Sequence, residues 1–194
     1  MLGIFGKVSK NKVKRIASIL DVLAFIIITY AFHELWWYFS AQIKSIPAVI
    51  NTAEWLAKQV FNSSYWIIHH TYDTSAWTEA INTIRFSNNG YITVNESCSG
   101  LKQFYQIIVL FILFPGPWMK RLWFIPMSIV IMHGINIFRI VVLGMVTLWL
   151  PDHWHFTHDW ILRPFFYVVI FMLWVWWVEK YGGFARILKK QEAK

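Results

Sequence analysis

Charged residues and cysteine are scarce in this chain. Charged residues occupy 14% of its 194 positions, whereas a soluble globular domain carries about 25%. This scarcity argues against a soluble protein and leaves no room for a large separate soluble domain. The single cysteine, Cys98, excludes an intrachain disulfide and a four-cysteine zinc site. The sequence also has no internal repeat and no low-complexity segment.

Acidic residues are few as well, 10 against 18 basic ones, and the formal net charge is +8. A charge of this sign is compatible with nucleic-acid binding. The basic residues, however, cluster at the ends of apolar runs, which is where the orientation of a membrane protein is set. We therefore expect no nucleic-acid partner.

Hydrophobic residues make up 57% of the chain and gather in four runs. Crossing the hydrocarbon core of a bilayer takes about 20 apolar residues in a helix, and the runs predict spans over residues 16–39, 101–116, 122–150 and 161–181. The first run is too long for a signal peptide, and no small-residue cleavage site follows it. The expected fold class is an all-α integral membrane protein, with about four transmembrane helices in a single membrane domain over residues 1–194.

Residues 40–97 form the most polar segment. Within it, residues 51–61 have the pattern of an amphipathic helix, with Trp55, Leu56 and Phe61 on or near one face. A helix of this kind suits the membrane surface.

Two short β-like runs lie between Ile81 and Val94, on either side of Asn89 and Gly90. Asn-Gly is the strongest short-range signal for a hairpin. We therefore expect a β-hairpin that leads directly into the segment with Cys98.

Three basic segments decide the expected orientation. They are residues 1–15, a loop with Lys120 and Arg121, and a C-terminal segment with Arg186, Lys189, Lys190 and Lys194. With four spans all three lie on one side, and the positive-inside rule places that side in the cytoplasm. Residues 40–97 and the loop "PDHWHFTHDW" then face the outside of the cell membrane.

Cys98 is expected at the outer mouth of the second span, near a helix start that Ser97 or Ser99 caps. Backbone N–H groups at a helix start favour a negative charge, which makes thiolate more available. Gly100 lets another chain approach the backbone closely. The alternative is that Cys98 is only a small buried residue near the membrane interface.

Arg139 lies well inside the third predicted span, where an arginine is costly and marks a functional site by default. Asn136 and His133 precede it at intervals of three residues, so the three side chains form a polar stripe on one helix face. The structural alternative is that Arg139 pairs with a carboxylate such as Glu96.

The loop before the last span contains His153, His155 and His158 and is expected on the same side as Cys98. A histidine near a thiol is the minimum for a nucleophile pair. The same histidines also suit a metal site or a solvent-facing cluster. Asp159 follows His158 and is a candidate to orient a histidine, although adjacent residues seldom hydrogen-bond through their side chains.

Cys98, Arg139 and a loop histidine together predict thiol-based acyl transfer. The thiolate attacks an amide carbonyl, and the histidine protonates the leaving amine and then activates the incoming nucleophile. The arginine stabilises the oxyanion or fixes the substrate. This chemistry predicts no cofactor and no metal ion.

The segments "ESCSGLKQF" (Glu96 to Phe104), "NIFRI" (Asn136 to Ile140) and "HDW" (His158 to Trp160) occur in that order and resemble the exosortase/archaeosortase family. The resemblance implies a membrane thiol protease and transpeptidase with Cys98 as nucleophile, Arg139 as the intramembrane arginine and His158 as the third catalytic residue. His155 is the fallback for the third position. Glu96, Ser99, Gly100 and Asn136 are the expected supporting residues.

The resemblance also implies the partners: a membrane-anchored protein substrate with a C-terminal sorting signal, the lipid bilayer, and a lipid or glycan acceptor at the cell surface. Many exosortases are longer and have more spans, so this chain would be a minimal version that serves a dedicated substrate. Two other functions are compatible with the sequence: a non-catalytic membrane scaffold or assembly factor, and a metal-binding or transport protein that uses the loop histidines. No acidic pathway crosses the predicted spans, which argues against ion transport.

Overall fold

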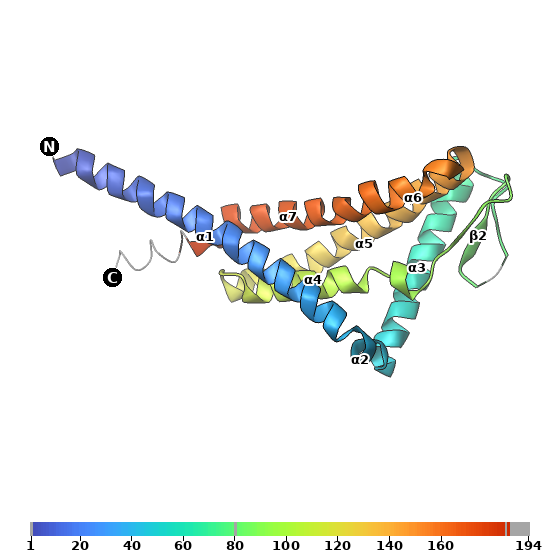
Figure 1. Ribbon diagram of the computed structural model, residues 1–194, viewed down its shortest axis with the longest axis horizontal. Coiled ribbons are helices and arrows are strands. Elements are labelled where there is room, and N and C mark those ends of the chain that lie inside the picture. Colours follow the sequence, from blue (N-terminus) through green and yellow to red (C-terminus); the bar gives the residue numbers. More distant parts are fainter. Residues whose placement is uncertain (1, 80, 185, 187–194) are drawn as a thin grey trace. The chain divides into compact units, whose positions relative to one another are not determined.

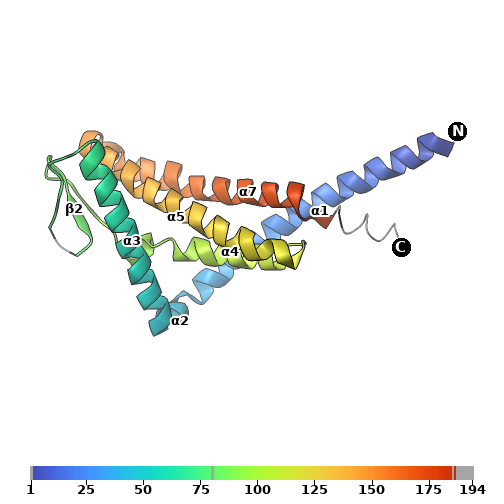
Figure 2. The same ribbon diagram turned by 180° about the vertical axis from the view of Figure 1, so that it is seen from behind.

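A computed structural model describes residues 2–79, 81–184 and 186, with side chains from residue 15 onward (Figures 1 and 2). The chain is mostly helical. Its helices are α1 (Leu2–Tyr38), α2 (Ser40–Lys44), α3 (Pro47–Thr71), α4 (Leu101–Leu113), α5 (Trp118–Trp149), α6 (Trp154–Phe156) and α7 (Arg163–Lys180). The strands are β1 (Trp77–Thr78), β2 (Thr83–Arg85) and β3 (Tyr91–Thr93). Shorter turns are the 3₁₀-helices η1 (Glu96–Cys98) and η2 (Pro151–His153) and the π-helix η3 (Thr157–Leu162).

Within the part of the chain that the structure describes, three helical segments are long and apolar enough to cross a membrane: Arg15–Tyr38, Trp118–Trp149 and Pro151–Lys180. The chain is therefore an α-helical membrane protein. The remaining predicted span corresponds to α4, which has 13 residues and a length of about 20 Å, against a hydrocarbon core of about 30 Å. The count of four spans stays a prediction.

Two connections that the sequence analysis treats as loops are helical. Lys120 and Arg121 lie in the first turn of α5, which begins at Trp118. The segment after Pro151 is built from η2, α6 and η3, so it continues into α7 without a break. Lys189, Lys190 and Lys194 of the basic C-terminal segment lie outside the described residues.

The chain divides into two compact units. The helices α4, α5 and α7 each contribute residues to both units. The first unit contains α1, Tyr105–Ser128 and the part of the chain from Ile170 onward. Its core is aromatic: the buried ring of Trp177 lies 5.6 Å from that of Phe111 and 5.0 Å from that of Phe124. Asp21 of α1 is also buried here, and its carboxylate accepts the Phe184 backbone N–H at 2.8 Å.

The second unit contains Phe39–Phe104 and Ile129–Val169, and α3 forms one side of it. This helix is longer than the predicted residues 51–61, because Pro47 starts it at a position where proline is well tolerated. One face is buried at helical spacing, through Ala53, Leu56, Ala57, Val60, Phe61, Ser64 and Ile68. Placing Trp55 on this face was wrong, since Trp55 is 60% exposed.

The three strands form an antiparallel sheet in the order β1-β2-β3, alongside α3 in Figures 1 and 2. In the hairpin of β2 and β3, Ile84 pairs with Ile92. Phe86 accepts the Asn89 N–H and donates its own N–H to Gly90, so the loop has three residues. Asn89, at φ +63°, takes the left-handed position that such a loop needs.

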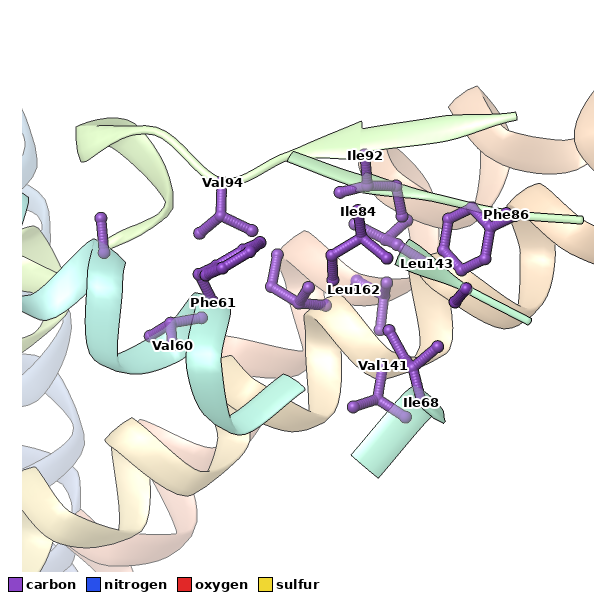
Figure 3. Close-up of a cluster of buried hydrophobic side chains, with 13 residues drawn as sticks. Val60, Phe61, Ile68, Ile84, Phe86, Ile92, Val94, Val141, Leu143 and Leu162 are labelled. Atoms are coloured by element: carbon purple, nitrogen blue, oxygen red, sulfur yellow. The ribbon is translucent and has the colours of Figure 1, made fainter. Parts of the chain in front are cut away.

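A buried apolar cluster joins the sheet to α3, α5 and η3 within the second unit (Figure 3). Ile84 of β2 and Phe86, the residue that follows this strand, are fully buried, as are Val60 and Ile68 of α3. Burial of side chains of this size stabilises the fold by about 1.5–3 kcal/mol each. The cluster also contacts Cys98, so it supports the segment that the sequence singles out.

Candidate functional site

Cys98 is the last residue of η1, the 3₁₀ turn that precedes α4. Asn95 starts this turn: its side chain accepts the Ser97 N–H at 3.0 Å, and its carbonyl accepts the Cys98 N–H at 2.9 Å. The cysteine is partly buried. It therefore lies just before the helix and not in its first turn.

Ser99 and Gly100 connect this turn to α4. The Ser99 hydroxyl accepts the backbone N–H of Leu101 at 3.3 Å, so this serine caps the helix start. Gly100 has φ +81°, and a Cβ atom at this position would lie 3.1 Å from Nδ2 of Asn136. The neighbour that a side chain here would meet is therefore Asn136 of the same chain, and the approach of another chain to Gly100 stays a prediction.

Asn136 of α5 holds the cysteine turn from the other side. Its side chain is fully buried, and its Nδ2 atom donates a hydrogen bond of 2.6 Å to the backbone carbonyl of Cys98. Its Oδ1 atom is buried with no hydrogen-bond partner among the described residues. A buried amide oxygen without a partner costs free energy, so it is available to a bound group.

Arg139 lies one turn further along α5, on the same face as Asn136. Its Nη2 atom is 2.8 Å from Nε2 of His158, and its guanidinium carbon is 5.7 Å from the centre of the Phe166 ring. The guanidinium is also close enough to Cys98 for an electrostatic interaction. Its Nε atom is buried and has no partner in the described part of the chain.

His158 lies in the π-helix η3 and is held on three sides. Besides Arg139, it contacts the Asp159 carboxylate through Nδ1 at 2.6 Å and stacks on Trp154 at 4.9 Å, with the rings 8° from parallel. The expectation that neighbouring residues do not pair was wrong here. A π-helix has more residues per turn than an α-helix, which brings consecutive side chains closer together around the axis.

Asp159 has a second partner. Its Oδ1 atom lies 3.3 Å from Nε of Arg163, one turn later, whose side chain is 63% exposed. The site therefore contains a continuous chain of contacts from Arg139 through His158 and Asp159 to Arg163.

The remaining predicted residues lie outside this chain of contacts. Glu96 is exposed and forms no ion pair within the described residues, so it is not the partner of Arg139. His155 is exposed as well. His133, the first residue of the polar stripe, packs against Phe104 at 6.3 Å between ring centres.

A metal site is not formed by the loop histidines. Across residues 2–79, 81–184 and 186, no group of three or more His, Cys, Asp and Glu side chains is arranged to hold a metal ion. Of the three histidines, only His158 faces Arg139, while His153 and His155 are exposed.

Sequence reasoning missed the aromatic support of the site. Trp154 precedes His158 by four residues, and this spacing places two side chains on the same helix face, so the stacking was readable from the sequence. The position of Phe166 against Arg139 depends on the packing of α7 against α5 and had no local signal.

Fold and site together define a class: an α-helical membrane protein in which a thiol, a guanidinium and an imidazole from three elements are gathered in one unit. A comparison with protein families identifies the class more closely, because the model of the transmembrane exosortase family matches residues 17–175. The chain belongs to this family. No match is found among curated proteins or solved structures.

Proposed function

We propose that the protein is a membrane-embedded cysteine transpeptidase that cleaves the C-terminal sorting signal of a membrane-anchored protein substrate. Cys98 is the nucleophile, Arg139 stabilises charge, and His158 transfers protons. Membership of the exosortase family supports this reaction class. The observation that carries the assignment of residues is the contact of 2.8 Å between Arg139 and His158, on the helix that also holds the Cys98 turn.

The first half of the reaction forms a thioester. The Cys98 thiol gives its proton to Nε2 of His158, and the sulfur attacks the carbonyl carbon of the scissile peptide. The carbonyl π electrons move to oxygen, and the resulting oxyanion is stabilised by Arg139. Collapse of this intermediate breaks the C–N bond, and the leaving amine takes the proton from His158.

The hydrogen bond between Arg139 and His158 has a consequence for this step. While Arg139 donates to Nε2, that atom has no lone pair free for the thiol proton. Arg139 therefore leaves Nε2 as the substrate carbonyl binds, because the developing oxyanion is a stronger acceptor than a neutral imidazole. Binding of the substrate thus moves Arg139 to the oxyanion and at the same time leaves Nε2 of His158 free to act as the base.

The second half transfers the acyl group. A hydroxyl or amine of a cell-surface lipid or glycan attacks the thioester, its proton passes to His158, and the carbon–sulfur bond breaks. Cys98 then recovers a proton from His158. The basic segments at both ends of the chain support an orientation with the termini in the cytoplasm and the site at the outer face of the cell membrane.

The test uses a membrane-anchored reporter that ends in a short motif, an apolar helix and a basic tail. We expect wild-type protein in native membranes to shorten the reporter and to form a covalent adduct that neutral hydroxylamine cleaves, as it cleaves a thioester. Because Cys98 is the only cysteine, a thioester on this chain identifies that residue.

Cys98→Ala is the matched control and should abolish processing and the adduct at an unchanged membrane level. Processing that persists when Cys98, Arg139 and His158 are all replaced by alanine would contradict the proposal. It would favour the alternative of a non-catalytic scaffold.

A further inference from the structure

We propose that Asp159 is a positioning residue that fixes His158 as the neutral tautomer with its proton on Nδ1. The contacts of His158 carry this proposal, and its catalytic consequence rests on the proposed function. The role is distinct from that of Arg139, because Asp159 contacts the far side of the imidazole ring.

The tautomer follows from the chemistry of the partner at Nε2. A guanidinium has only N–H donors and no acceptor. The contact of 2.8 Å between Arg139 Nη2 and His158 Nε2 is therefore a hydrogen bond only if Nε2 is the acceptor. A neutral imidazole that accepts at Nε2 carries its proton on Nδ1.

Asp159 is placed to hold that proton. Its Oδ1 atom lies 2.6 Å from Nδ1 of His158, which is short even for a bond with a charged acceptor. An ionised carboxylate only accepts hydrogen bonds, so it matches an Nδ1–H donor and opposes the other tautomer. Arg139 and Asp159 thus favour the same protonation state of His158, with the proton on Nδ1, from opposite sides of the ring.

Two further contacts hold the carboxylate and the ring in this geometry. Arg163 lies 3.3 Å from the same Oδ1 atom and limits the rotation of Asp159. Trp154 stacks on His158 and limits the rotation of the imidazole. Once Arg139 moves away, Nε2 is left with its lone pair exposed and its direction fixed, as proton transfer requires.

The decisive measurement is nitrogen-15 and proton NMR of the imidazole in full-length protein labelled at histidine and reconstituted in nanodiscs. A His158→Gln variant identifies the signals of this residue among the 7 histidines. We expect a protonated Nδ1, an unprotonated Nε2, and an Nδ1 proton that resonates far downfield and exchanges slowly with water. A proton on Nε2 would overturn the proposal.

Asp159→Asn and Asp159→Ala should move the Nδ1 proton upfield and speed its exchange with water. Arg163→Gln removes only the second partner of the Asp159 carboxylate and should leave the proton on Nδ1 of His158. Asp152→Asn, which changes an exposed carboxylate in η2, is the matched control. An unchanged Nδ1 proton in both Asp159 variants would contradict the positioning role.

The kinetic consequence is measured with the reporter. Asp159→Asn should lower the processing rate by about 10²-fold, because general acid–base catalysis contributes that much or more. If His158→Gln is inactive while Asp159→Asn has full activity, this inference fails and the proposed function stands. If His158→Gln has full activity while Asp159→Asn changes the Nδ1 proton, the tautomer assignment stands and the proposed function fails.

Discussion

The Nδ2 atom of Asn136 donates a hydrogen bond of 2.6 Å to the backbone carbonyl of Cys98, across 38 positions of the sequence. Three residues after Asn136, Arg139 reaches His158, which follows it by 19 positions. One helix face therefore holds the cysteine turn and meets the histidine. Two consecutive side chains of the polar stripe on α5 organise the site.

Replacing Asn136 tests this arrangement. Asn136→Ala removes the hydrogen bond to the Cys98 carbonyl and leaves that carbonyl without its side-chain donor, at a cost of about 1–3 kcal/mol. We expect the turn to loosen, so that a small maleimide labels Cys98 several-fold faster while the reporter is processed about tenfold more slowly. The two rates should thus change in opposite directions.

Thr147→Val is the matched control for this change. Thr147 is also buried on α5, but its hydroxyl donates to the Leu143 carbonyl within the helix. Both rates should stay near those of the wild type. A decrease of both rates in Asn136→Ala would show that the hydrogen bond does not hold the turn.

Gly100 gives a test of the same turn through the backbone. Gly100→Ala places a side chain at φ +81° and 3.1 Å from Nδ2 of Asn136. The left-handed conformation alone costs an L-residue about 1–2 kcal/mol, so we expect a lower thermal unfolding midpoint and slower processing.

Gly134→Ala is the control on α5. A Cβ atom there would meet nothing within 4 Å, and alanine is favoured over glycine in a helix by about 1 kcal/mol. This variant should be as stable as the wild type or more so, with unchanged processing. Equal effects of the two substitutions would argue against a special role of Gly100.

Much of this site could be predicted from the sequence because its residue types are rare in their surroundings. Cys98 is the only thiol, and Arg139 stands out in an apolar run. The three-residue interval before Arg139 placed Asn136 on the same helix face, where the structure has it. Membership of the exosortase family, suggested by the motifs around these residues, is shown by the family comparison.

The rest depended on features that local patterns do not encode. The pairing of His158 with Asp159 lies in a π-helix, and sequence periodicity does not distinguish one inserted π turn from an α-helix. Asn136 is the neighbour of Gly100 because of the way α5 packs against the Cys98 turn. Trp55 was misplaced because the buried face of α3 passes through Leu56 and Phe61, and Trp55 lies about 100° around the axis from Leu56, outside that face.

Asp73 makes the stability of the second unit dependent on pH. Burial raises the pKa of its carboxyl, but hydrogen bonds from the N–H and hydroxyl groups of Ser75 and Ser87 outweigh burial and leave the pKa below its ordinary value. A carboxyl whose pKa is lower in the folded state stabilises the fold above its unfolded pKa, and this contribution is lost as the pH falls through the folded pKa.

We therefore expect Asp73→Asn to lower the thermal unfolding midpoint at neutral pH and to reduce its decrease on acidification from about pH 5 downward. Thermal unfolding in detergent across this range measures both effects. Asp152→Asn, an exposed carboxylate without these contacts, should follow the wild-type curve. An Asp73→Asn curve parallel to that of the wild type would contradict the role of the carboxylate.

Arg139→Lys tests whether a positive charge alone suffices. Lysine keeps the charge but lacks the planar set of donors from which Arg139 contacts His158. We expect reporter processing to fall by about 10²-fold, the typical loss when an oxyanion donor is removed. Arg163→Lys, at an exposed position, should cost less than tenfold. Equal rates in the two variants would show that Arg139 acts only as a charge.

The proposed orientation can be tested by labelling intact cells with a membrane-impermeant maleimide. Ile81 is 90% exposed in the segment that we place outside, and Met119 is 76% exposed in the first turn of α5, which we place on the cytoplasmic side. In a Cys98→Ala background, Ile81→Cys should be labelled in intact cells, and Met119→Cys only after permeabilisation. Cys98 of the wild type should be labelled from outside but slowly, because it is partly buried. Labelling of Met119→Cys in intact cells would reverse the orientation and place the site on the cytoplasmic side.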